Sequence, residues 1–242
     1  MSHIPGPDGP ALVCRSLTVR FGAVTALDGL NLEVLGGRIT ALVGPNGAGK
    51  TTTLRAAAGL VRLALGSVSV FGHDPAVAPV AARRRLGLLP DRPALPAELT
   101  VRELLSLRAA LYRIRGDTVA EATAAVTGEL GIGELLDRRT GSLSHGQAQR
   151  VALAAVLMPA PPLILVDEPM TALDLEAQTV VRDALVRRAR RGTAVLMTTH
   201  TVGHVAAVAH RVLRMERGRV TAGRAGTHDV EELERWILAG SS

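Results

Sequence analysis

The chain of 242 residues is poor in lysine, aromatic residues and cysteine. Lys50 is its single lysine, so the other cationic side chains are arginine, and aromatic residues make up 2% of the chain. The single cysteine, Cys14, excludes an internal disulfide and fits a reducing compartment, where a lone thiol is usually a small core residue. The net charge of +6 is compatible with nucleic acid, anionic lipid or small anions as partners.

The chain also lacks a hydrophobic run long enough for a membrane span. The longest apolar stretch, residues 151–166, is too short to cross a bilayer comfortably and contains three prolines. The first residues have no basic start followed by an apolar run, so they do not predict a secretory signal. We expect a cytoplasmic protein that meets a membrane only peripherally.

Short hydrophobic runs predict an α/β fold. Two segments near the N-terminus, residues 12–21 and 30–35, alternate in the manner of antiparallel strands. Three later apolar runs are separated by helical segments, which is typical of a mostly parallel sheet. These runs are residues 39–43, 163–166 and 194–197. A hairpin is expected over residues 212–221 and a final helix over residues 229–238.

The stretch from about residue 92 to residue 158 is mainly helical and is expected to be an insertion in the α/β core. In it, Thr100 and Glu103 form the capping box that begins a helix. No repeat or Gly/Ser-rich linker divides the chain. We therefore expect one domain over residues 11–235, between a flexible N-terminus at residues 1–10 and a C-terminal tail at residues 236–242.

A glycine-rich loop between a predicted strand and a predicted helix carries the strongest chemical signal. It fills the phosphate-loop pattern G-x-x-x-x-G-K-[ST] with Gly44, Pro45, Asn46, Gly47, Ala48, Gly49, Lys50 and Thr51. Glycines let backbone N–H groups and the helix N-terminus surround a polyphosphate, and Lys50 can reach its β- and γ-phosphates. Thr51 is a candidate Mg²⁺ ligand and Thr52 a further phosphate donor. The loop therefore predicts binding of a nucleoside triphosphate.

Two adjacent acids follow the predicted strand at residues 163–166. Ligands bind beyond the carboxyl ends of parallel strands, so Asp167 and Glu168 are candidates for a Walker B pair. Asp167 would hold Mg²⁺ through water, and Glu168 could polarise the water that attacks the γ-phosphate. Two such acids are often only a solvated turn, and the phosphate loop earlier in the chain is what favours the catalytic interpretation.

A third motif narrows the class of phosphate-binding protein. Leu143-Ser144-His145-Gly146-Gln147 resembles the LSGGQ signature of ATP-binding cassette (ABC) ATPases, and it precedes the Walker B strand as in that family. Ser144 and Gln147 also form a capping box, so an ordinary helix start would have the same residues. The resemblance covers roughly residues 12–220, with the motifs in order. It implies a P-loop NTPase core with a mostly parallel sheet, an N-terminal antiparallel β subdomain and an inserted α-helical subdomain.

The resemblance also implies roles for residues outside the phosphate loop. Phe21 stands where the family has an aromatic side chain that stacks on adenine, although a core phenylalanine is the alternative. Residues 170–174 resemble the D-loop, and His200 stands where the family's histidine reaches the γ-phosphate. In a head-to-tail dimer, the nucleotide of one chain would meet three signature residues of the other, namely Ser144, Gly146 and Gln147.

Two positions depart from the family pattern. Asp91 stands where a glutamine usually contacts Mg²⁺ and the transmembrane partner, and its shorter carboxylate could still bind Mg²⁺ or its water. His145 replaces the first glycine of the signature and adds a titratable group beside the phosphate of the partner chain. Such substitutions resemble those of exporter-type cassettes.

The resemblance implies an ATPase that uses ATP and Mg²⁺, with Lys50, Glu168 and His200 in catalysis. It would pair with another cassette and drive a separate transmembrane permease from the inner face of the membrane, in export rather than import. No nucleic-acid partner is expected. Two alternatives remain open: a cassette that acts on nucleic acid or ribosomes, which the basic charge would favour, and a monomeric P-loop phosphotransferase, which would not need residues 143–147.

Overall fold

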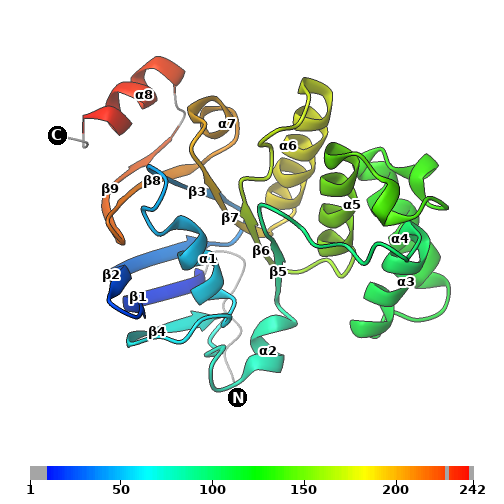
Figure 1. Ribbon diagram of the computed structural model, residues 1–242, viewed down its shortest axis with the longest axis horizontal. Coiled ribbons are helices and arrows are strands. Elements are labelled where there is room, and N and C mark those ends of the chain that lie inside the picture. Colours follow the sequence, from blue (N-terminus) through cyan, green and yellow to red (C-terminus); the bar gives the residue numbers. More distant parts are fainter. Residues whose placement is uncertain (1–9, 227–228, 240–242) are drawn as a thin grey trace.

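The computed structural model describes residues 10–226 and 229–239, which form two sheets and the helices around them (Figure 1). The smaller sheet is antiparallel and has the order β2-β1-β4. Its strands are β1 (Pro10–Phe21), β2 (Val24–Leu35) and β4 (Leu65–Val70). The middle strand β1 buries Leu12, Leu17 and Val19, which fixes the sheet on the core.

The larger sheet has six strands in the order β5-β6-β7-β3-β8-β9, and all neighbours are parallel except β8 and β9. Its strands are β3 (Ile39–Val43), β5 (Leu86–Leu89), β6 (Leu163–Asp167), β7 (Ala194–Thr199), β8 (Arg211–Glu216) and β9 (Arg219–Ala225). β3 and β6 are buried along their whole length, as expected of parallel strands covered on both faces. Their carboxyl ends lie at the same edge of the sheet, where β3 leads into the phosphate loop and β6 into the two acids.

Helices α1 and α6 flank the larger sheet, and a group of helices is inserted between β5 and β6 (Figure 1). Outside the insertion lie α1 (Lys50–Ala57), α2 (Pro79–Arg83), α6 (Leu175–Arg190), α7 (Val202–Ala206) and α8 (Val230–Leu238). The insertion holds α3 (Val101–Leu111), α4 (Asp117–Leu130), the 3-10 turns η1 (Gly133–Leu135) and η2 (Thr140–Ser142), and α5 (His145–Leu157). Both halves of the predicted capping box at Thr100 and Glu103 are present at the start of α3.

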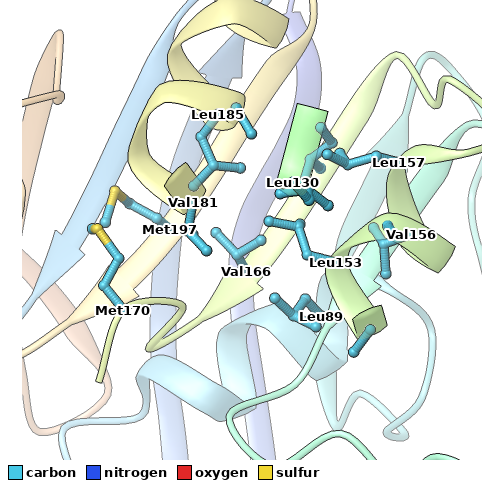
Figure 2. Packing of buried hydrophobic residues seen from close by; sticks show 14 of the residues in the cluster. Leu89, Leu130, Leu153, Val156, Leu157, Val166, Met170, Val181, Leu185 and Met197 are labelled. Atoms are coloured by element: carbon cyan, nitrogen blue, oxygen red, sulfur yellow. The ribbon is translucent and has the colours of Figure 1, made fainter. Parts of the chain in front are cut away.

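Successive residues of the parallel strands point to two separate cores. Val166 of β6 and Met197 of β7 pack with Leu153 of α5 on one face of the sheet (Figure 2). Leu165 packs on the other face, in the cluster that contains Leu54 of α1 and the smaller sheet. Because side chains alternate between the two faces, the same sheet packs against the helical insertion on one face and against α1, which follows the phosphate loop, on the other.

The predicted fold class is confirmed, and several element boundaries differ from the prediction. β2 begins at Val24 rather than at residue 30, because its first half pairs with the end of β1. β4, β5, α2 and α7, none of which exceeds six residues, were not predicted. Among the described residues, no helix has the length and hydrophobicity of a membrane span.

The two ends of the chain fall partly outside the described residues. The predicted flexible N-terminus includes residues 1–9, which are not described, and Pro10, which begins β1. The C-terminal tail was predicted from residue 236, but α8 continues to Leu238. Residues 240–242 of that tail are outside the described part of the chain.

Candidate active site

The phosphate loop lies between the end of β3 and the start of α1, as the sequence predicts. Its backbone runs so close to neighbouring segments that a Cβ atom on Gly44 would collide with the carbonyl oxygen of Met215. A Cβ atom on Gly49 would lie 2.6 Å from the carbonyl oxygen of Ala26, and Gly49 has a φ of 104°. Space and backbone angle therefore both require glycine here.

Lys50 is the first residue of α1 and is only 7% exposed. Its Nζ donates hydrogen bonds to the carbonyl oxygens of Gly44 at 2.7 Å and Pro45 at 3.1 Å. Burial lowers the pKa of the Lys50 ammonium, and the nearby carboxylates of Glu168 and Asp167 partly offset that effect. An ammonium has three N–H donors, so the two loop carbonyls fix its direction and leave it one donor for a phosphate.

A cavity of about 420 Å³ lies beside this loop. Its wall combines the loop, Asp91, the two acids and the start of β2. It consists of Val24, Thr25, Ala26, Asn46, Gly47, Gly49, Lys50, Thr51, Thr52, Asp91, Asp167 and Glu168. The structure thus brings together the three predicted Mg²⁺ ligands Thr51, Asp91 and Asp167. Hydroxyl and carboxylate oxygens are the ligands that Mg²⁺ prefers, so these residues fit the metal.

Asp167 ends β6 in a buried position, 4% exposed. Its register partner on β7 is Thr198, whose hydroxyl donates a hydrogen bond to Asp167 Oδ1. This contact holds Oδ1, and among the described residues no hydrogen bond is made to Oδ2. The Walker B motif did not predict that Thr198 supports Asp167. One signal could have indicated it: the apolar run of this strand ends in the polar pair Thr198-Thr199.

Glu168 is the first residue after β6, and its backbone has a left-handed φ of 47°. Its side chain is 13% exposed, and Oε1 lies 2.7 Å from Nδ1 of His200, which is 51% exposed. With an ionised carboxylate as the acceptor, Nδ1 of His200 is the donor in this contact, and Nε2 is left for another partner. The other oxygen, Oε2, accepts a hydrogen bond of 2.9 Å from the hydroxyl of Thr171.

The signature motif forms the N-terminus of α5. Ser144 is the N-cap: its Oγ accepts from the backbone N–H of Gln147, and Gln147 Oε1 accepts from the N–H of Ser144 at 3.1 Å. The predicted capping box is therefore present. None of the three predicted signature contacts, Ser144, Gly146 and Gln147, lines the cavity at the phosphate loop. His145 is exposed and, with Arg92, lines a different hollow of about 390 Å³.

Phe21, the residue predicted to stack on adenine, lies outside the lining of this cavity. Phe21 ends β1 and is 52% exposed, but it is not among the residues that line the cavity. Val24, Thr25 and Ala26, which begin β2 after the turn that follows Phe21, do line the cavity. Ala48 of the phosphate loop is buried in the core cluster, so only its backbone can face a nucleotide.

Comparison with known proteins decides the family. The sequence model of the ABC transporter family matches residues 27–171. The hemin import ATP-binding protein HmuV of Streptomyces coelicolor is 40% identical over 90% of this chain and 80% of its own length. This chain belongs to the ABC transporter family. A second ABC relative, the daunorubicin resistance ATP-binding protein DrrA2 of Streptomyces coeruleorubidus, is 34% identical over 89% of this chain and 67% of its own.

Solved ABC cassettes have the same fold. An ATP-binding subunit of an ABC transporter matches with a TM-score of 0.87 and 26% identity, over 94% of this chain and 99% of that one. A bacterial ABC transporter cassette solved as a dimer matches with a TM-score of 0.81 at 23% identity, over 88% and 98% of the two chains. The chain is thus an ABC ATP-binding subunit and an ATPase.

Proposed function

We propose that this ABC cassette powers transport through a separate transmembrane partner, by closing around ATP with a second cassette. The observation that carries the proposal is that Ser144 and Gly146 of the signature helix do not line the cavity at the phosphate loop of their own chain. A nucleotide on the loop of one chain would then meet the signature helix of another. ATP joins the two chains head to tail, and hydrolysis removes the contact that holds them.

The charged groups that line the cavity, and His200, which lies outside its lining, each have a place in hydrolysis. Lys50 binds the β- and γ-phosphates, and Glu168 accepts the proton of the attacking water. His200 contacts the γ-phosphate through Nε2, because Nδ1 is engaged with Glu168. Thr51, Asp91 and Asp167 would hold Mg²⁺. The metal would supply positive charge that neutralises the phosphate oxygens as the bond to the γ-phosphate breaks.

The link to the membrane partner starts at Asp91. This residue lines the nucleotide cavity and also an adjacent hollow of about 470 Å³, together with Leu60, Leu88 and Pro90. A partner segment seated in that hollow would contact the residue that also faces Mg²⁺, so closure at ATP would move the partner. The cassette would therefore lie peripherally on the inner face of the membrane, where ATP is present.

For the direction of transport, we propose export. Relatives named for hemin import and for daunorubicin resistance are 40% and 34% identical, and these values do not separate the two directions. The proposal rests on Asp91 and His145, whose substitutions resemble those of exporter-type cassettes.

The function is tested with Glu168→Gln, which keeps the shape of the side chain and removes its basicity. We expect this variant to bind ATP, to stop turning it over, and to remain a stable dimer by size-exclusion chromatography. Glu176→Gln, which changes an exposed glutamate in the first turn of α6, is the matched control and should hydrolyse ATP at the wild-type rate. Unchanged turnover in Glu168→Gln would exclude Glu168 as the base.

Reconstitution of the wild type with its membrane partner in proteoliposomes tests transport and direction together. With the cassette and ATP outside the vesicle, an exporter accumulates substrate in the lumen, and hemin and daunorubicin are the first substrates to try. Glu168→Gln should abolish that accumulation. Loss of preloaded substrate from the vesicle on addition of ATP would instead establish import.

A further inference from the structure

Glu168 is held at four points by two neighbouring segments. Its backbone N–H donates to the carbonyl oxygen of Thr198 at 3.0 Å, and its own carbonyl oxygen accepts from the N–H of Thr171 at 3.2 Å. On the side chain, Oε1 contacts His200 and Oε2 accepts the hydroxyl proton of Thr171 at 2.9 Å. Thr171 therefore contacts Glu168 twice, once through its backbone and once through its side chain.

The loop that carries Thr171 is shaped to make this second contact. Glu168 and Ala172, on either side of it, have left-handed φ values of 47° and 59°, which non-glycine residues rarely adopt. Asp174 then caps α6 by accepting from the N–H of Ala177 at 2.7 Å, which anchors the far end of the loop. The strained turn is thus fixed at both ends, and the Thr171 hydroxyl lies beside the carboxylate in a partly buried setting.

From this geometry, we infer that Thr171 is a positioning residue for the proposed catalytic base, aiming the Glu168 carboxylate at the water that attacks ATP. The inference rests on the proposed role of Glu168. Each carboxylate oxygen has two lone pairs, so the contacts with Thr171 and His200 leave positions free to accept a proton from water. The threonine hydroxyl keeps its own proton throughout and only donates a hydrogen bond.

The two supports of Glu168 differ in how firmly they can hold it. The His200 side chain is 51% exposed, and its proposed contact with the γ-phosphate requires it to respond to the nucleotide. The Thr171 hydroxyl comes from the same turn as Glu168 and does not depend on a second element. A carboxylate that has lost this donor can rotate away from its productive direction, and catalysis is sensitive to small misplacements of the base.

The test compares Thr171→Val with Thr171→Ser. Valine has the shape of threonine and keeps the backbone N–H that closes the turn, whereas serine keeps the hydroxyl. Loss of a hydrogen bond to a charged group predicts a fall in kcat of about tenfold for Thr171→Val, with KM for ATP and Tm unchanged. Thr171→Ser should stay within about twofold of the wild-type kcat, because it restores the donor. The matched control is Thr127→Val, which removes a hydroxyl bonded to the Thr123 carbonyl oxygen in α4 and should leave kcat unchanged.

Three results would overturn the inference: Thr171→Val retains the wild-type kcat, Thr171→Ser loses as much as Thr171→Val, or the loss appears in KM or Tm. Glu168→Gln is measured in parallel to separate this inference from the proposed function. If Glu168→Gln stops turnover and Thr171→Val does not, only the positioning role fails. If Glu168→Gln still turns over ATP, the assignment of the base fails as well.

Discussion

The charged groups of the site are each held by a neighbouring segment. Lys50 is fixed by the carbonyl oxygens of its own loop, Asp167 by Thr198, and Glu168 by Thr171 and His200. The motifs predict which residues carry the chemistry, because they fix residue types and spacing. They do not predict Thr198 as a support, since its approach to Asp167 depends on the pairing of β6 with β7.

Cys14 gives a prediction about stability at high pH. Burial raises the pKa of its thiol to about 12 from the ordinary value of 9.0. Below pH 9 the thiol is neutral in both the folded and the unfolded chain, so it adds no pH dependence. Between pH 9 and 12 only the unfolded chain ionises, which stabilises that state and lowers the free energy of unfolding. Urea unfolding of the wild type should therefore lose stability through this window relative to Cys14→Ala. A stability difference that is constant with pH would contradict the prediction.

At the scale of helices and strands, the sequence predicted the elements whose own residues contain a helix cap or a continuous apolar run. Capping boxes at Thr100 and Ser144 marked the starts of α3 and α5, and continuous apolar runs marked β3, β6 and β7. β4 contains Gly66 and two serines, and β5 has only four residues. Both are strands because β1 and β6 pair with them, and a local pattern cannot show that pairing.

An ionic contact joins the helical insertion to the core. Glu129 of α4 has a side chain that is 9% exposed, and Arg188 of α6 donates from Nε to its Oε2 at 3.1 Å. Arg188 also reaches the carbonyl oxygen of Leu157 at the end of α5, and Arg187 donates to the carbonyl oxygen of Glu129. The Arg188 guanidinium of α6 thus contacts both α4 and α5. None of the sequence motifs predicts this contact.

Arg188→Ala should destabilise the protein by about 3 kcal/mol, because it leaves a buried carboxylate with only the partial support of Arg187. Arg182 is the control: it pairs with its neighbour Asp183, both side chains are well exposed, and Arg182→Ala should cost less than about 1 kcal/mol. Free energies of unfolding from urea titrations measure both. Equal effects of the two variants would show that the ion pair between Arg188 and Glu129 contributes no more to stability than a surface ion pair.

At the scale of the whole molecule, the sheet places the phosphate loop and the acids at one edge, and the insertion carries the signature helix. The order of motifs predicts this division, and the family resemblance predicts that the second half of the site comes from another chain. The contribution of the start of β2 to the cavity was not predicted, because Val24, Thr25 and Ala26 have no distinctive chemistry and reach the site only through the packing of the smaller sheet against the core.

Mixing two inactive variants tests most directly whether two chains share one nucleotide. Lys50→Ala disables the phosphate loop, and Ser144→Arg places a bulky cation at the signature helix, so each alone should lack ATPase activity. In a head-to-tail pair of the two variants, one composite site has both halves intact. An equimolar mixture should therefore recover about a quarter of the wild-type activity, if chains pair at random and sites act independently. A mixture that hydrolyses ATP no faster than the two variants measured separately would contradict the shared site.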